Sequence, residues 1–232
     1  MPSRDLADVK SIHLFKNVAD RHFATLVEAA YLQRFPPHVV LIEECQHPHF
    51  LHVVLEGSVE LFSRHAGHET SIDVVRPVAT FILAAVVGEQ PYLASGRTLE
   101  ASRILMIPGE AVRSVFDQDP AFARAIVREL AQAFRGMIKA LKNHKLRTGN
   151  ERLANWIIRQ NLAHGATGRF SLPYDKRTLA ARLGMTPESL SRSLGALASH
   201  GVAARGRTIT IRNLAALTDL AKPSPSIDDP DY

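Results

Sequence analysis

The sequence predicts an α+β protein in which an N-terminal β-roll of the jelly-roll type is joined by one long helix to a C-terminal winged helix-turn-helix. Short β-rich pieces run from Tyr31 to Pro108, and a helical pattern extends from Pro120 to about His144. Beyond it, three helical stretches precede a hairpin pattern. The expected parts are a β-roll domain over 1–117, a long helix over 118–146, a winged helix-turn-helix over 147–220 and a disordered tail over 221–232.

Composition narrows the class of protein. The chain has 232 residues, 46% of them apolar, which is enough for real cores. No apolar run approaches the roughly 18 residues that span a bilayer, and the N-terminus lacks the apolar stretch of a secretory signal. We therefore expect a cytoplasmic protein with no membrane partner. The single cysteine, Cys45, excludes an internal disulfide and argues against an iron–sulfur cluster held by about four thiolates from one chain.

Charge is unevenly distributed along the chain. Residues 1–144 carry 15 Lys/Arg and 16 Asp/Glu, residues 145–213 carry 12 and 3, and the tail from Leu214 carries 1 and 4. The net charges are therefore −1, +9 and −3. A short basic domain behind a near-neutral one is typical of polyanion binding, although solubility alone can also explain such an asymmetry. Nucleic acid is the first partner to consider.

The N-terminal part begins with about thirty residues of helical pattern and then changes period. Five β-rich pieces follow, broken by glycine and proline: "VVLIEE", "FLHVVLEG", "SVELFSRH", "TSIDVV" and "ATFILAAVV". Many short strands at regular spacing predict a barrel or jelly roll. The stretch "GEAVRSVF" predicts a short helix after the last strand.

The long helical stretch has two apolar rows. One row repeats at alternating steps of four and three residues, as a coiled-coil heptad does, and comprises Ile126, Leu130, Ala133, Met137 and Ala140. The second row lies beside it and comprises Val127, Phe134, Ile138 and Leu141. A helix that is apolar on two sides needs two partners, so we expect one row to pack on the β-roll and the heptad row to form a homodimer interface. The alternative is one buried helix inside a monomer.

The basic third predicts three helices and a hairpin. "NERLANWIIRQNLAHG" is followed by "DKRTLAARLG", in which Asp175 is placed as an N-cap and Gly184 as a stop. Thr186 is the expected N-cap of the next helix, with Pro187 at its first position, where a missing N–H costs nothing. "GVAARGRTITIRN" then alternates like a small hairpin, or wing.

The helix "TPESLSRSL" gathers Glu188, Ser191 and Arg192 in one quadrant and turns its leucines to the opposite side. Two helices joined by a tight turn, with short polar side chains on the second, are typical of a helix-turn-helix that enters the DNA major groove. Arg192 can pair with guanine, Glu188 can accept from cytosine, and Ser191 can contact either. Further expected contacts are Thr186, Ser189 and the phosphate-binding Lys176, Arg177, Arg205 and Arg207. Each of these charges could equally be solvated surface.

At this point the chain resembles the CRP/FNR superfamily of bacterial transcription regulators over nearly its whole length. Ala180, Gly184 and Leu190 fall where the general helix-turn-helix pattern has a small residue, a turn glycine and an inward apolar residue. "ESLSR" matches the Glu-x-x-Ser-Arg signature of the FNR branch, which implies inverted repeats of TTGAT-like half-sites. The resemblance also implies a cyclic-nucleotide-binding-like β-roll, a homodimer and RNA polymerase as a further partner.

The resemblance does not extend to the cyclic-nucleotide motif. Binders in this superfamily carry Phe-Gly-Glu and, about ten residues later, Arg-Ser/Thr. Aligning Phe81 with that phenylalanine places Ile82 and Leu83 at the Gly and Glu positions, and an apolar Leu93-Ala94 at the Arg-Ser position. An apolar pocket without a cation cannot hold a phosphate, because a buried unpaired anion costs several kcal/mol or more. We therefore expect an effector other than a cyclic nucleotide.

Haem is one alternative effector group. The stretch from Phe81 to Pro108 resembles nitric-oxide-responsive denitrification regulators of the superfamily, which are thought to use haem. "SIHLF" resembles a segment near their N-terminus, which implies His13 as a candidate haem ligand and, by analogy with carbon-monoxide sensors, Pro2 as a second. The alternative for His13 is an interfacial histidine at a helix start.

A redox-responsive or an effector-independent regulator remains an alternative. Cys45 lies in a turn between Glu44 and Gln46, and nearby carboxylates do not lower a thiol pKa, so an inert cysteine is expected over a redox sensor.

A cupin-like metalloenzyme is the competing class. The sequence contains His47-x-His49, and Glu56 follows seven residues after His49. On a strand, His52 and Glu56 share one face, so these are the two side chains that we expect to project together. Two ligands are too few for a tight zinc or iron site, so no metal is expected.

Overall fold

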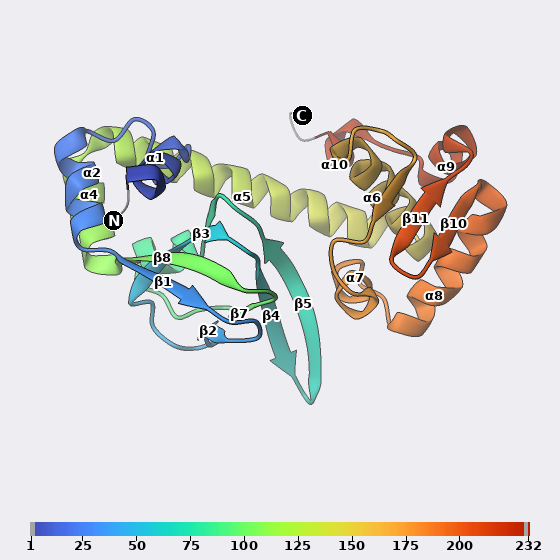
Figure 1. Cartoon of the computed structure of the whole chain (residues 1–232), viewed down its shortest axis with the longest axis horizontal. Coiled ribbons are helices and arrows are strands. Elements are labelled where there is room, and N and C mark those ends of the chain that lie inside the picture. Colours follow the sequence, from blue (N-terminus) through green and yellow to red (C-terminus); the bar gives the residue numbers. More distant parts are fainter. Residues whose placement is uncertain (1–2, 230–231) are drawn as a thin grey trace. The chain divides into compact units, whose positions relative to one another are not determined.

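The computed structural model describes residues 3–229 and residue 232. The chain forms two compact units, Met1–Ala133 and Phe134–Tyr232, each with its own apolar core. The boundary falls inside the longest helix, α5 (Pro120–Leu146). Figure 1 labels most of the helices and strands along the chain. Within the described residues, no helix is long and apolar enough to cross a membrane.

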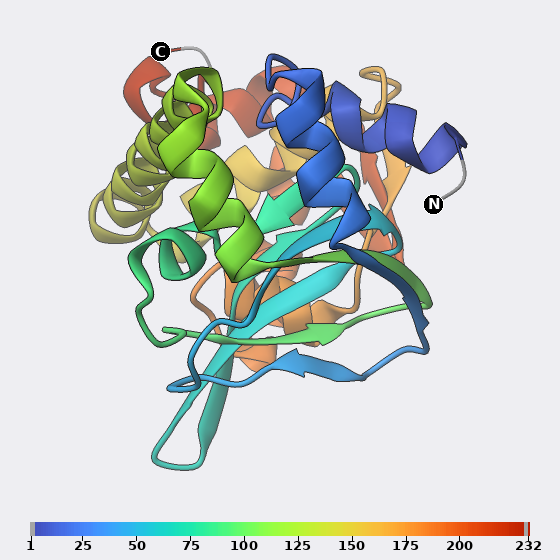
Figure 2. The same ribbon diagram turned by 90° about the vertical axis from the view of Figure 1, so that its left-hand side faces the viewer.

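The first unit is a β-roll of two four-stranded antiparallel sheets, with strand orders β1-β8-β3-β6 and β2-β7-β4-β5. The strands are β1 (Tyr31–Phe35), β2 (Val40–Ile42), β3 (Phe50–Glu56), β4 (Val59–His65), β5 (His68–Val75), β6 (Ala79–Phe81), β7 (Ser95–Thr98) and β8 (Ser102–Pro108). The β4–β5 hairpin projects beyond the other strands in both views (Figures 1 and 2). The predicted β-roll is confirmed.

Strand β3 shows how alternation builds two cores. Leu51, Val53 and Leu55 face a core shared with helices, whereas Val54 faces a second core between the two sheets. The helices that cover the outer side are α1 (Ser3–Ser11), α2 (Asp20–Glu28), α4 (Gly109–Gln118) and the first turns of α5 (Figure 1). This double burial explains why β3 is apolar on both faces.

One predicted strand is partly wrong. "ATFILAAVV" was expected to be β throughout, but β6 ends at Phe81 and α3 (Leu83–Gly88) follows. Ile82 takes a left-handed conformation with φ 64° between the two elements. Leu83 and Val86, three residues apart, both point into the helix-covered core, which requires helical rather than strand spacing.

The structure corrects the expected dimer row on α5 at its first member. Ile126 is fully buried in the core of the first unit and is not available to a second chain, and Leu130 is half-buried against that core. Ala133 and Ala140 are exposed. The apolar side chains exposed on α5 are Val127 (61%), Phe134 (61%), Met137 (65%), Ile138 (42%) and Leu141 (50%). The two rows are neighbours on the helix, and heptad regularity alone did not reveal which one the β-roll covers.

The second unit contains the predicted helices and wing around one core. Its elements are α6 (Gly149–Ala163), β9 (Arg169–Ser171), α7 (Lys176–Arg182), α8 (Pro187–Ala196), a 3-10 turn (Leu197–His200), β10 (Val202–Arg205), β11 (Thr208–Ile211), α9 (Leu214–Ala221) and α10 (Pro225–Asp228). Strand β9 pairs with β11 and makes the wing three-stranded, which the sequence did not predict. Helix α9 was also missed.

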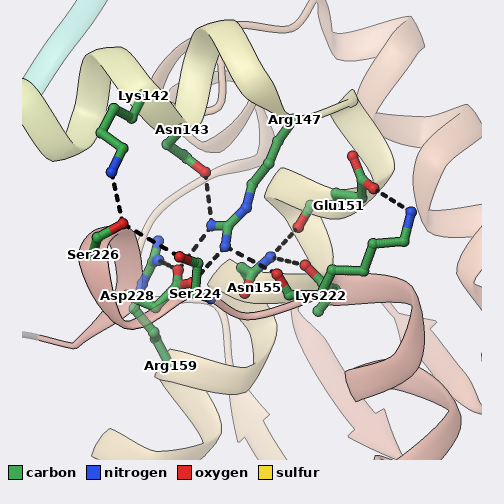
Figure 3. Close-up of polar contacts among 11 residues, drawn as sticks. Lys142, Asn143, Arg147, Glu151, Asn155, Arg159, Lys222, Ser224, Ser226 and Asp228 are labelled. Atoms are coloured by element: carbon green, nitrogen blue, oxygen red, sulfur yellow. Dashed lines mark hydrogen bonds and ion pairs between the residues drawn. The ribbon is translucent and has the colours of Figure 1, made fainter.

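The tail differs from the expected disorder. Asp228 of α10 accepts hydrogen bonds from both Nη atoms of Arg147, at 2.8 and 2.5 Å, and from Arg159 Nη1 at 3.1 Å (Figure 3). The Ser224 N–H adds a fourth at 2.7 Å, and Lys142 donates to Ser226 at 2.6 Å. Ion pairs and hydrogen bonds therefore hold this acidic segment on the basic domain.

Candidate DNA-binding surface

Helix α8 begins where its sequence requires. Thr186 Oγ1 accepts the Ser189 N–H at 3.2 Å, and Pro187 occupies the first turn, so the helix start is capped as predicted. The preceding turn contains Gly184 at φ +61°, a left-handed conformation that disfavours other residues. The short turn fixes α8 directly after α7.

The inner side of α8 is apolar and anchored. Leu190 is fully buried and Leu194 is 9% exposed, and Leu197 of the 3-10 turn that follows is also fully buried; all three belong to the core of the second unit. That core also includes Leu179 and Ala180 of α7. Burying a leucine side chain stabilises by about 1.5–3 kcal/mol, so this face is fixed to the domain.

The outer side of α8 exposes Glu188, Ser191 and Arg192 together, as the sequence predicted. Arg192 Nη2 donates to Ser189 Oγ at 2.9 Å, and Thr186 Oγ1 donates to the same oxygen at 3.2 Å. Hydrogen bonds from its own backbone N–H and from Thr186 lower the pKa of Glu188, with a smaller contribution from Arg192. An anion, a hydroxyl and a cation therefore project side by side into solvent.

A hollow of about 470 Å³ lies beside this face. Lys176 of α7, Ser191 of α8, Arg205 of β10 and Arg212 line it, together with small residues of the 3-10 turn and β10. Three elements thus bring three cations to one surface. Arg212 was missed by sequence reasoning, although its place directly after the alternating wing strand and its charge were available signals.

The other two expected phosphate contacts differ from each other. Arg177 is exposed in the first turn of α7, beside Lys176. Arg207 is exposed, but its Nη2 donates to the Leu172 carbonyl at 2.9 Å, which commits part of its guanidinium to the domain. Arg177 is therefore the freer cation of the pair for an incoming polyanion.

In the β-roll, carboxylates already neutralise the guanidinium of Arg97 on β7. Arg97 pairs with Glu60 at 2.7 Å and with Glu69 at 2.8 Å, and its guanidinium lies 4.3 Å from the ring centre of buried Phe62. Glu60 is only 3% exposed. The Arg97 guanidinium is thus already paired with two carboxylates and is not free to pair with a phosphate.

Two of the candidate cofactor and redox residues, His13 and Cys45, lie at the surface. His13 is exposed in the turn after α1, while its neighbours Leu14 and Phe15 are fully buried. His13 lines neither the hollow beside α8 nor a second one in the β-roll, so its position gives no support to haem ligation. Pro2 lies outside the described residues. Cys45 is exposed in the turn after β2, at φ 70°.

The histidines of the metalloenzyme alternative do not form a metal site. Glu56, the expected carboxylate ligand, pairs with Arg103 at 2.9 Å. Across residues 3–229 and 232, no three His, Cys, Asp or Glu side chains come together as a set that could hold a metal ion.

Comparison with known proteins gives two family matches. Residues 151–220 match the Crp-like helix-turn-helix domain, and residues 32–119 match the cyclic nucleotide-binding domain. Among relatives, a cyclic AMP receptor protein of Thermus thermophilus is 27% identical over 74% of this chain and 79% of its own length. An anaerobic regulatory protein of Pasteurella multocida is 22% identical over 74% of this chain, and the match spans 64% of that regulator.

A solved structure shows the same fold. FixK2 from Bradyrhizobium japonicum superimposes with a TM-score of 0.72 at 19% identity, over 84% of this chain and 98% of FixK2. The superfamily to which these proteins point consists of transcription regulators rather than enzymes, which removes the metalloenzyme alternative. With both family matches in the expected order and this architecture, the chain belongs to the CRP/FNR superfamily of transcription regulators.

Proposed function

We propose that the protein binds DNA sequence-specifically as a homodimer and that α8 is its recognition helix. One observation carries the proposal: Glu188, Ser191 and Arg192 are exposed on one face of α8 while Leu190 and Leu194 anchor the opposite face. Glu188 can accept a hydrogen bond from cytosine, Ser191 can contact either type of base pair, and Arg192 can pair with guanine. Lys176, Arg177, Arg205 and the newly identified Arg212 supply phosphate contacts. The expected operator is an inverted repeat of TTGAT-like half-sites, since the signature "ESLSR" is intact.

The second copy is expected along the exposed side of α5. Val127, Phe134, Ile138 and Leu141 lie at steps of seven, four and three residues, which is the spacing of a coiled-coil seam. A two-fold axis along this seam would place two recognition helices in successive major grooves, about 34 Å apart. Phe134→Glu should leave the fold intact and yield monomers in analytical ultracentrifugation, whereas the exposed control Gln132→Glu should stay dimeric. A dimeric Phe134→Glu protein would remove this seam from the proposal.

Binding to operator and to random DNA tests the role of α8. Arg192→Ala should weaken binding to the TTGAT-like palindrome by about 1–3 kcal/mol per site and relax selection at the guanine. Lys176→Ala should weaken binding to both DNAs alike and lower the salt dependence. Fluorescence anisotropy at several salt concentrations measures both. Equal losses on operator and random DNA for Arg192→Ala would contradict base recognition by this residue.

The effector is proposed to be something other than a cyclic nucleotide. The neutralised Arg97 and the apolar residues at the motif positions support this. A haem-based sensor of nitric oxide remains a hypothesis from resemblance alone, as does RNA polymerase as a partner. An absorption spectrum of the purified protein tests haem directly. A Soret band that His13→Ala leaves unchanged would exclude His13 as a ligand.

A further inference from the structure

The second half of α5 carries positive charge without compensating negative charge. Its cations between residues 134 and 146 are Arg135, Lys139, Lys142 and Lys145. The same range contains no Asp or Glu. It also exposes Phe134, Ile138 and Leu141, the apolar side chains of the proposed dimer seam. Two copies of this helix brought together along the seam would repel each other, because like charges facing each other across an interface oppose association.

Described residues of the segment 225–232, here called the acidic tail, lie against this basic side of α5. Three α5 side chains donate hydrogen bonds to the tail: Lys142 to Ser226 Oγ at 2.6 Å, Lys139 to the Asp229 carbonyl at 2.5 Å, and Arg135 to the Tyr232 carbonyl oxygen. The first of these contacts is drawn in Figure 3. The contacts move toward the start of α5 as the residue numbers of the tail rise. The sequence of the tail has three aspartates and no Lys or Arg, so the tail brings negative charge to the basic side of α5.

The tail contacts lie beside the seam and not on it. At about 100° per residue, Arg135 and Lys142 fall roughly 80–100° around the helix from Phe134. Ile138 and Leu141 fall within about 40° of Phe134. The tail therefore leaves the apolar side chains of the seam exposed, and it places its charge at their edge. In paired helices, charges at this edge position decide which partner the helix accepts.

We propose that the acidic tail is part of the dimer interface, where its negative charge offsets the cations of α5 and lets a second copy of the chain associate along the seam. This inference rests on the proposed dimer and assigns a function to a segment outside the seam. The partner that fits the combined surface is another copy with its own tail in place, since a copy without it would present uncompensated cations. Salt screens interactions between exposed charges. The contribution of the tail should therefore be large at low salt and small at high salt.

Asp229→Lys tests this charge effect in the intact chain. Asp229 is exposed, and the substitution retains the backbone carbonyl that Lys139 contacts and the Asp228 pair with Arg147. Sedimentation velocity over a dilution series measures the dimer dissociation constant at about 0.1 M and about 1 M salt, where the Debye length is about 10 Å and about 3 Å. Asp229→Lys should raise this constant about fivefold or more at the lower salt concentration and less than about twofold at the higher one. Asp219→Lys makes the same change of charge on α9, and this matched control should raise the constant less than about twofold at either salt concentration.

Equal weakening by Asp229→Lys and Asp219→Lys, or weakening by Asp229→Lys that persists at about 1 M salt, would overturn the proposal. Adding Lys139→Glu to Asp229→Lys restores the net charge of this side of α5 and should return the dissociation constant to within about twofold of the wild type. A double variant that does not recover would also overturn it. A wild-type dimer that Asp229→Lys leaves unchanged would refute the role of the tail alone and keep the seam. A wild-type protein that stays monomeric at both salt concentrations would refute the proposed dimer itself.

Discussion

The pairing of Asp228 with Arg147 gives the sharpest stability prediction. Asp228→Ala removes two hydrogen bonds from Arg147, one from Arg159 and one from the Ser224 N–H. The Arg147 side chain is only 6% exposed, and it would retain only the Asn143 amide oxygen at 3.1 Å and the Lys222 carbonyl at 3.3 Å. The substitution therefore leaves a nearly buried cation without its counter-ion.

The magnitude follows from burial and from the position of the tail. Breaking a buried ion pair on one side costs about 3–5 kcal/mol when the remaining charge stays buried. Here α10 is a four-residue helix held by these polar contacts, and its detachment would let water reach Arg147. The loss cannot exceed the free energy with which the tail is held, so we expect about 2–3 kcal/mol, the strength of one or two charge-assisted hydrogen bonds.

Urea unfolding followed by tryptophan fluorescence measures this loss. Trp156 is the one tryptophan of the sequence, lies on α6 and is 6% exposed, so it reports on the second unit. All variants must be compared at one protein concentration, because dimers gain stability with concentration. Asp219→Ala, an exposed carboxylate on α9, is the control and should change stability by less than about 0.5 kcal/mol. A loss for Asp228→Ala no larger than for this control would refute the reasoning, as would a double-mutant cycle with Arg147→Met that shows no coupling.

Two further predictions concern the cores and caps. Burial alone would raise the pKa of Asp119, but hydrogen bonds from the Ala19 N–H, from His22 and from the first N–H groups of α5 outweigh burial and lower this pKa. The stability that Asp119 contributes is therefore present above the ordinary pKa of 3.8 and is lost as the pH falls through the folded-state pKa. Asp119→Asn should cost about 2–4 kcal/mol at pH 7, and its unfolding curves should lose part of the acid dependence of the wild type. Leu190→Ala should cost about 2–5 kcal/mol by thermal unfolding and weaken operator and random DNA binding together, because α8 loses its anchor. Retention of full operator affinity in a folded but destabilised Leu190→Ala would contradict that link.

Local signals carried most of the sequence prediction. The cap of α8 depends only on Thr186, Pro187 and the N–H of Ser189, all within four residues, so sequence alone could place the helix and the face it exposes. The rows on α5 were harder, because both are apolar and only the packing of Ile126 on the β-roll decides which one is free.

Long-range contacts limited the remainder. Arg212 joins Lys176 and Ser191 only after the wing folds back beside α8, so no spacing in the sequence links them. The docked tail was missed because proline and acidic composition usually predicts disorder. The opposite net charges of the tail and the preceding basic segment were visible, but the specific partners Arg147 and Arg159 depend on the fold.

The same ion pair also predicts an effect on DNA binding. The Arg147–Asp228 contact connects the end of α5 to α10, and Arg159 connects α10 to α6, which packs on α8 in one compact unit. A dimer that reads two half-sites needs its recognition helices at a fixed spacing. If the connection between α5 and α6 becomes more flexible, binding to both half-sites must order it, which costs free energy. Asp228→Ala should therefore weaken binding to the full palindrome more than to an isolated half-site, in anisotropy titrations at one salt concentration. Selection at the guanine should not change, because Arg192 is untouched. Equal weakening on palindrome and half-site would show that the tail supports the winged domain alone and does not hold the joint.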